Sequence, residues 1–261
     1  MRPIGALLGA ILLVAAAPAA RGGDAPAGRW SDLECMGCHQ QATPELTAAW
    51  RAGAHGGAAA AVRCIACHGD RHPGSAVKAR RAATCIGCHG GAGAPVARSY
   101  LTSKHGVIAT IEGPRWDHAR PLSDGNYRAP NCAYCHFHQA GHGTGGDVAD
   151  ACLDCHSSRF TDVLSDAGRR GMAIGLAKVR EAEAAIAARR EGMDLSDAEE
   201  AELAALLRAM REGPLAGLRL GIVHQAPDFQ WWLGQAALDG ALLRIKASLS
   251  RLRRRKALGD P

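Results

Sequence analysis

Cys35-Met-Gly-Cys38-His39 is the first of five pentapeptides in this chain that share the pattern Cys-x-x-Cys-His. The others, numbered here as motifs 2 to 5 in chain order, are Cys64-Ile-Ala-Cys67-His68, Cys85-Ile-Gly-Cys88-His89, Cys132-Ala-Tyr-Cys135-His136 and Cys152-Leu-Asp-Cys155-His156. In this pattern two thiols bond to the vinyl groups of one porphyrin, and the following imidazole ligates its iron. The motifs use all 10 cysteines, so the sequence predicts five covalently bound c-type haems.

Paired cysteines have two other common uses, as zinc ligands and as disulfides. Neither a zinc ribbon nor a disulfide framework requires a histidine directly after every second cysteine. Here a histidine follows in all five motifs. The sequence therefore favours haem attachment over both alternatives.

Residues 1–20 have the pattern of a secretory signal peptide. One cation, Arg2, precedes an apolar run over residues 4–17, and small residues continue to Ala20 before polar residues begin at Arg21. This pattern predicts cleavage after Ala19 or Ala20 and a periplasmic or otherwise exported protein. The alternative is an uncleaved membrane anchor, but the apolar run is shorter than the roughly 20 residues that a span needs. Export agrees with covalent haem attachment, which takes place in the exported compartment of bacteria.

Residues 21–160 hold every motif and have little apolar patterning of their own. The segment is rich in Gly, Ala, Arg and His, and the whole chain has only 3 Phe and 3 Tyr. Few apolar residues recur there with the period of a helix or a strand. Five porphyrins would supply the missing apolar core. We therefore expect a region of short helices and loops that wrap the haems and are largely unfolded without them.

Residues 161–261 contain no cysteine and have the pattern of long helices. Apolar spacing predicts helices over residues 169–191, 196–212 and 229–258, with a capping box of Ser196 and Glu199 at the start of the second. The predicted fold class is mainly α: a haem-organised multihaem cytochrome region followed by a C-terminal bundle of long helices. Such helices pack on one another or on a second copy in a homo-oligomer.

The chain carries a formal net charge of +6 and ends on a basic run, residues 251–256. A solvated helix C-terminus is one interpretation of this run, since cations are stabilised there by the helix dipole. A docking patch for an acidic redox partner is the other. We expect no nucleic-acid partner in an exported compartment.

Seven of the 12 histidines lie outside the motifs. A six-coordinate haem needs a second axial ligand, usually His or Met, and methionine is scarce here beyond the signal peptide. Five histidines in glycine-flanked or interhelical settings are predicted to be these distal ligands: His55, His72, His105, His142 and His224. They would complete the iron ligands begun by His39, His68, His89, His136 and His156. His118, beside Asp117, and His138, close to a motif histidine, fit this role less well.

Several fragments around the motifs resemble the hydroxylamine oxidoreductase (HAO) family of multihaem cytochromes, which is distantly related to pentahaem nitrite reductases. They are Ser103-Lys104-His105-Gly106, Pro114-Arg-Trp116-Asp117-His118, Ala129-Pro130-Asn131-Cys132-Ala-Tyr-Cys135-His136 and Pro227-Asp228-Phe229-Gln-Trp231-Trp232-Leu-Gly234. The resemblance covers about residues 35–234. It implies that motif 3 holds a five-coordinate catalytic haem. It also implies that Asp117 and His118 move protons for hydroxylamine, nitrite or nitric oxide.

The chain departs from that family in two ways. Three of the family's eight haems have no motif here. The oxidative members also cross-link the catalytic haem to a tyrosine from the C-terminal part of a neighbouring subunit, whereas all tyrosines of this chain, Tyr100, Tyr127 and Tyr134, precede motif 5. Without that tyrosine, reduction fits as well as oxidation. A salt-bridged loop pair without a catalytic role is the alternative for Asp117 and His118.

Two functions stay open at this point. One is an exported pentahaem cytochrome that carries electrons and has one open haem for redox chemistry on a small nitrogen compound. The other is a pure electron-transfer protein, with every haem six-coordinate, that serves a separate oxidoreductase. Both imply redox partner proteins, such as other cytochromes or quinol-linked donors and acceptors, and the sequence leaves open whether the chain is an enzyme.

Overall fold

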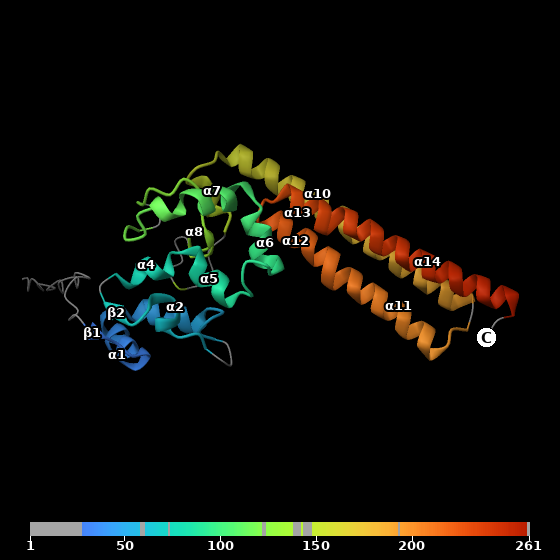
Figure 1. Cartoon of the computed structure of the whole chain (residues 1–261), viewed down its shortest axis with the longest axis horizontal. Coiled ribbons are helices and arrows are strands. Elements are labelled where there is room, and N and C mark those ends of the chain that lie inside the picture. Colours follow the sequence, from blue (N-terminus) through green and yellow to red (C-terminus); the bar gives the residue numbers. More distant parts are fainter. Residues whose placement is uncertain are drawn as a thin grey trace, which may run out of the picture.

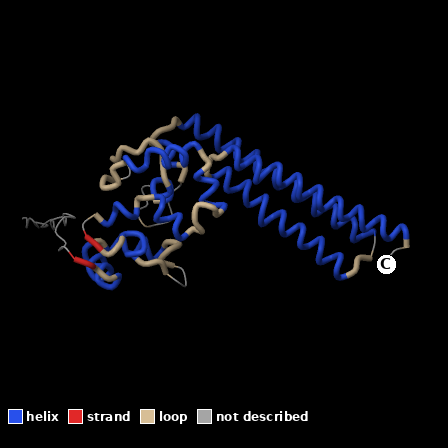
Figure 2. Tube along the Cα trace, viewed as in Figure 1, coloured by secondary structure: helices blue, strands red, loops and turns tan. Residues whose placement is uncertain are grey.

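The protein has two structurally different parts, which the computed structural model shows side by side (Figure 1). Residues 28–57, 61–72, 74–121, 124–137, 142, 148–192 and 194–259 are described. The expected signal peptide and His138 lie outside these residues. Short helices and loops form the part that carries the motifs, and long helices form an elongated bundle that extends from it (Figure 2). The predicted fold class is confirmed.

The motif-bearing part, called the haem region below, consists of short elements joined by turns. In chain order these are β1 (Gly28–Arg29), α1 (Asp32–Ala42), α2 (Pro44–Ala52), α3 (Cys64–His68), β2 (Arg71–His72), α4 (Ser75–Ala79), α5 (Ala82–Cys88), α6 (Pro95–Leu101), α7 (Lys104–Glu112), the 3-10 turn η1 (Gly113–Arg115), α8 (Cys132–His136) and α9 (Asp150–Leu153). The two strands pair antiparallel, with Gly28 opposite His72.

The buried side chains of the haem region are few and mostly small. Ala97, Ala129, Ala133 and Ala151 are buried, and so are the aromatic rings of Tyr100, Trp116 and Tyr134. The extended hydrophobic cluster of the protein lies instead in the long helices. This distribution agrees with the expectation that porphyrins supply the apolar core of the haem region.

In the C-terminal part, the described residues form seven consecutive helical elements. They are α10 (Ser158–Gly192), α11 (Asp197–Met210), the π-helical turn η2 (Arg211–Leu215), α12 (Ala216–Val223), α13 (Pro227–Phe229), the π-helical turn η3 (Gln230–Gln235) and α14 (Ala236–Leu258). The helices α10, α11 and α14 run alongside one another (Figure 1). Their core includes Leu203, Leu238 and Ile245, all 0% exposed, and each fully buried side chain of this size contributes about 1.5–3 kcal/mol.

The helix bounds confirm the predicted start of the second long helix. They correct the predicted start of the first long helix and the predicted end of the second. Ser196 and Glu199 form the predicted capping box, in which the Ser196 N–H donates to Glu199 Oε2 at 2.9 Å. The first long helix begins at Ser158 rather than residue 169, because its first turns bury almost no apolar side chain and so have no periodic signal. The second continues past residue 212, because η2 widens to accommodate Pro214, which has no N–H to donate.

The basic run ends at the tip of α14, at the end of the bundle remote from the haem region (Figure 1). Arg251 pairs with Glu202 at 3.3 Å and Arg255 with Glu199 at 2.9 Å, so part of the run joins α14 to α11. This placement favours the interpretation as a charged helix end over an electron-transfer docking patch. Among the described residues, no helix is long and apolar enough to cross a membrane.

Candidate haem-binding site

Every Cys-x-x-Cys-His motif lies in a short helix or at its end. Motifs 2 and 4 are themselves the helices α3 and α8, motif 1 lies within α1, motif 3 ends α5, and motif 5 starts in α9. Residues i, i+3 and i+4 of an α-helix share one face. A helical motif therefore presents both thiols and the imidazole on one side, where a single porphyrin can bond to all three. All 10 cysteines lie in the described residues and carry free thiols.

Four motif histidines each lie opposite a histidine from outside the motifs. The ring centroids are 6.2 Å apart in the pair His39 and His72, 6.1 Å in His89 and His55, 5.6 Å in His68 and His142, and 6.0 Å in His156 and His105. An iron between two imidazoles would hold their centroids about 6 Å apart, given metal–nitrogen bonds of about 2 Å and about 1 Å from each nitrogen to its ring centre. The four separations fit an iron with two histidine ligands.

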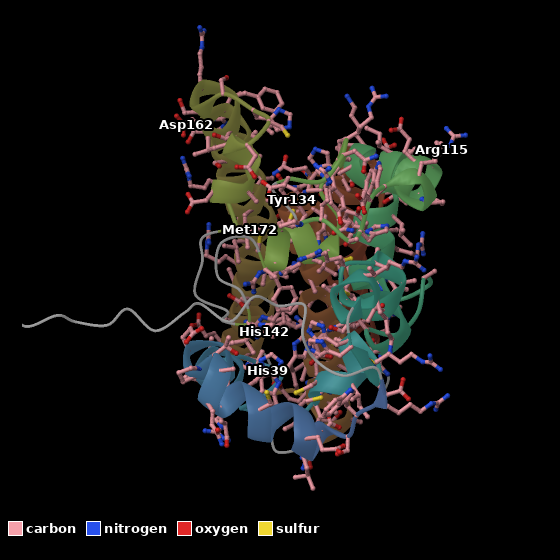
Figure 3. The ribbon with its side chains drawn as sticks, turned by 90° about the vertical axis from the view of Figure 1, so that its left-hand side faces the viewer. His39, Arg115, Tyr134, His142, Asp162 and Met172 are labelled. Carbon is pink, nitrogen blue, oxygen red and sulfur yellow. The ribbon has the colours of Figure 1, made fainter. Side chains whose placement is uncertain are left out.

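The facing atoms are visible directly in the pair from motif 2. The Nε2 atoms of His68 and His142 are 3.4 Å apart, and an iron between them would widen this separation to about 4 Å. His142 also lies close to His39 of motif 1, in the same part of the haem region (Figure 3). The ligands of the first two haems are therefore neighbours.

The remaining motif histidine is His136 of motif 4, and it lies near His224. Burial lowers the pKa of His224, and the neighbouring His136 is the next largest cause. Ser99 fixes the tautomer of His224. Its hydroxyl donates to the Val96 carbonyl at 2.9 Å, so its oxygen accepts from His224 Nδ1–H at 2.7 Å. The proton on Nδ1 leaves the lone pair on Nε2, which is the form that ligates iron.

A second hydroxyl orients the ring of motif 1 in the same way. His39 Nδ1 lies 2.8 Å from Thr43 Oγ1, one helical turn further along the chain. The Thr43 hydroxyl also points at the His39 carbonyl, 3.4 Å away, which can only accept. The threonine oxygen is thus free to accept from Nδ1–H, and His39 presents Nε2 to the haem.

The end of α12 delivers His224 to the haem region. Gly217 and Gly221 let α12 lie directly against the η3 backbone: a Cβ atom on Gly217 would be 2.5 Å from the Leu233 carbonyl oxygen. After Val223 the helix ends in a Schellman motif, in which the Ala226 N–H donates to the Gly221 carbonyl at 2.8 Å. Gln225 adopts a left-handed φ of 52° to make this turn. α12 therefore ends at the point where His224 faces the haem region.

Burial favours the neutral form of several of these histidines, which is the form that binds iron. Burial is the first cause that lowers the pKa of each of the following: His68, His105, His136, His142 and His224. A second histidine contributes in every case; for His105 it is His156, its ring partner. The site therefore disfavours protonation that would compete with a metal.

The thiols of successive motifs lie close to one another in chain order. After burial, the main cause that raises the pKa of Cys35 is the Cys64 thiol, and for Cys67 it is the Cys85 thiol. A hydrogen bond between the side chains of Cys85 and Cys132 raises the pKa of Cys85. Burial and then the Cys152 thiol raise the pKa of Cys135 to about 11. Motifs 1 to 5 thus form a continuous spatial series.

Asp117 and His118 lie in a loop that is closed by its own hydrogen bonds. Asp117 Oδ1 accepts from the Ala119 N–H at 3.0 Å, and its other oxygen pairs with Arg120 at 3.5 Å. His118 Nε2 donates to the Gly113 carbonyl at 3.1 Å, which leaves Nδ1 to accept from the Tyr127 hydroxyl at 3.1 Å. Both ring nitrogens of His118 are used within the chain. Its predicted catalytic role, with that of Asp117, stays a prediction.

The structure places four of the predicted distal histidines opposite a motif histidine, and it places the fifth, His224, near His136. Sequence reasoning missed Ser99 and Thr43, which orient two of the rings. Thr43 follows His39 by one helical turn, a spacing that could have indicated it. Ser99 and His224 are 125 residues apart, so no local pattern predicts that contact.

Comparisons with known proteins agree with this geometry. The family described as "Seven times multi-haem cytochrome CxxCH" matches residues 50–148, a range that includes motifs 2, 3 and 4. Among solved structures, a chain of the reducing HAO-like protein complex of Kuenenia stuttgartiensis aligns with a TM-score of 0.60 and 17% sequence identity. The alignment covers 87% of this chain and 86% of that chain. At this identity the likeness shows a shared fold.

Proposed function

Because the chain is a multihaem c-type cytochrome with the fold of a HAO-like protein, we propose that it is a five-haem electron carrier in which every iron has two histidine ligands. The observation that carries this proposal is the facing of a motif histidine and a distal histidine in four pairs, to which the proximity of His224 and His136 adds a fifth. A bound c-type haem supplies an iron that gains and loses one electron. With both axial positions filled by histidine, such a site exchanges electrons without binding a substrate.

The series of neighbouring motifs supports transfer along the chain. The thiols of motifs 1 and 2, 2 and 3, 3 and 4, and 4 and 5 interact pairwise. The two cysteines of each motif would hold a porphyrin through thioethers, and its histidine together with a distal histidine would ligate the iron. Bound in this way, the haems would lie in the same series as the motifs and would supply one-electron transfer between neighbours.

We propose export and redox partners as parts of the same function. The pattern of residues 1–20 supports cleavage of a signal peptide and maturation in the exported compartment. The similar solved structure is a complex of HAO-like proteins. That likeness supports other cytochromes as partners, with quinol-linked donors and acceptors as further candidates.

The proposal is tested by removing one distal ligand at a time from the holoprotein. His55→Ala should convert the haem of motif 3 from low spin to high spin, while mass spectrometry still finds five haems. His118→Ala is the matched control, because both nitrogens of His118 are bonded within the chain, and it should leave all haems low spin. A His55→Ala protein with the parent's spectrum would remove His55 from the ligand set.

Redox chemistry on a small nitrogen compound is the second candidate. It requires the haem of motif 3 to have one axial position free, whereas the ring centroids of His55 and His89 are 6.1 Å apart at that motif. The hydrogen bond between His118 and Tyr127 is the observation that favours it, since a His–Tyr pair can move a proton. Asp117→Asn should then lower turnover of hydroxylamine or nitrite and leave haem content intact. Equal turnover in the two proteins would count against that role.

A further inference from the structure

Motifs 4 and 5 are joined by a hydrogen bond between side chains that the ligand geometry does not require. The Tyr134 hydroxyl donates to Asp154 Oδ2 at 2.6 Å. Each residue directly precedes the second cysteine of its motif, so the two occupy the same position in motifs 4 and 5. We propose that this pair fixes the position of the motif 4 haem relative to the motif 5 haem and thereby sets the rate of electron exchange between them. The inference rests on the proposed electron-carrying function.

Tyr134 is held firmly enough to act as such a link. Its side chain is 8% exposed. Its N–H donates to Asn131 Oδ1 at 3.0 Å, which caps α8, and the Asn131 side chain in turn donates to the Arg80 carbonyl at 2.7 Å. The backbone of motif 4 is therefore tied to the segment before motif 3.

A layer of aromatic rings supports Tyr134 from its other side. The Tyr127 ring packs edge-on against Tyr134, with 6.0 Å between centroids, and Trp116 packs on Tyr127 at 5.1 Å. His118 bonds the Tyr127 hydroxyl. The rings of Tyr127 and Trp116 therefore support Tyr134 by packing, which does not involve the Tyr127 hydroxyl.

The acceptor end of the bond belongs to the peptide that carries the motif 5 thiols. Asp154 lies between Cys152 and Cys155, and the Cys152 thiol neighbours Cys135 of motif 4. The hydrogen bond therefore joins the two motifs where their thiols are also neighbours. A hydrogen bond to a carboxylate is about twice as strong as a neutral one.

The test uses one variant that removes the bond and one that weakens it. Tyr134→Phe keeps the ring and removes the hydroxyl, whereas Asp154→Asn keeps an acceptor but turns the charge-assisted hydrogen bond into a weaker neutral one. Tyr127→Phe is the matched control, because its hydroxyl bonds His118 and no motif residue. Each holoprotein is checked for five haems by mass. Two quantities are then measured: the magnetic interaction between the ferric haems of motifs 4 and 5, and the rate of electron equilibration after photoreduction.

Loss of the bond should reduce the population of the fixed arrangement by roughly 10- to 100-fold relative to alternatives. We expect Tyr134→Phe to weaken the magnetic interaction and slow equilibration, Asp154→Asn to do so to a smaller extent, and the double variant to be no slower than Tyr134→Phe alone. Tyr127→Phe should retain the parent's rate. A parent-like rate in Tyr134→Phe would overturn the proposal. So would a shift of the haem potentials in Asp154→Asn alone, which would show that Asp154 acts by charge.

Failure of the proposed link between motifs 4 and 5 can be distinguished from failure of the electron-carrier proposal. A high-spin haem or a haem count below five in the unmodified protein contradicts the proposed function, and both are measured before any variant is compared. The variants change neither a cysteine nor an iron ligand. A slower exchange with five low-spin haems therefore assigns the effect to the link between motifs 4 and 5.

Discussion

Ser99→Ala should release His224 from the haem of motif 4. Ser99 is fully buried, and its oxygen accepts from His224 Nδ1–H at 2.7 Å. An alanine there would leave a buried N–H donor without a partner, at a cost of about 1–3 kcal/mol. Since 1.4 kcal/mol corresponds to a factor of ten, this is a weakening of roughly 5- to 150-fold. Loss of a hydrogen-bond partner behind a metal ligand typically lowers metal affinity by about 10- to 100-fold, which agrees.

The assay is carbon monoxide binding to the reduced holoprotein, together with the spin state of the oxidised form. In Ser99→Ala we expect a new high-spin signal and carbon monoxide binding at up to one of the five haems. Thr102→Ala is the matched control on the adjoining turn, because its hydroxyl bonds the Arg98 carbonyl and no histidine. A Ser99→Ala protein that stays low spin and binds no carbon monoxide would refute the claim that Ser99 holds this ligand.

Three further predictions concern the approach of α12 and the protonation of the ligands. Gly221→Ala would put a Cβ atom 2.7 Å from the Gln230 backbone nitrogen. We expect it to lower the free energy of unfolding by about 1–3 kcal/mol, measured by thermal unfolding, and to give a high-spin haem at motif 4, seen in optical spectra. Gly213→Ala is the control, because its Cβ would meet open space and should not destabilise the protein. Gln225→Gly should raise the free energy of unfolding by up to about 1 kcal/mol, because glycine adopts the left-handed φ of 52° without strain; a lower melting temperature would contradict this. Burial lowers the pKa of His68 and of the other buried ligands. Below the ordinary histidine pKa of about 6.5 the unfolded chain therefore binds more protons than the folded chain, and the free energy of unfolding should fall as the pH drops below that value. Melting temperatures that stay constant across this pH range would argue against the prediction.

The sequence predicts which residues hold the haems, because this information is local. Two thiols and an imidazole at helical spacing define each motif, and counting histidines against the scarce methionines predicts the distal set. The pairing is not local. His142 faces His68 across 74 residues of chain, and His55, which precedes motif 2, faces motif 3. Those pairs depend on how the loops fold, and the spacing of apolar residues along the chain does not predict loop conformation.

The long helices show the same limit. Ser196 and Glu199 indicate their helix start through side chains that bond nearby backbone, and that prediction is confirmed. The early start of α10 could not be predicted, because its first turns bury almost no apolar side chain. The passage through Pro214 could not be predicted, because proline usually ends a helix. The placement of His224 depends on tertiary contacts, since Gly217, Gly221 and Gly234 matter only once α12 meets η3.

The most direct test of the account is a low-temperature EPR spectrum of the oxidised holoprotein, recorded alone and with hydroxylamine or nitrite. Five irons held by paired histidines predict purely low-spin signals that neither compound changes. A high-spin ferric signal that shifts on addition would contradict the electron-carrier proposal. It would show that one haem is open to substrate and return motif 3, with Asp117 and His118, to the centre of the function.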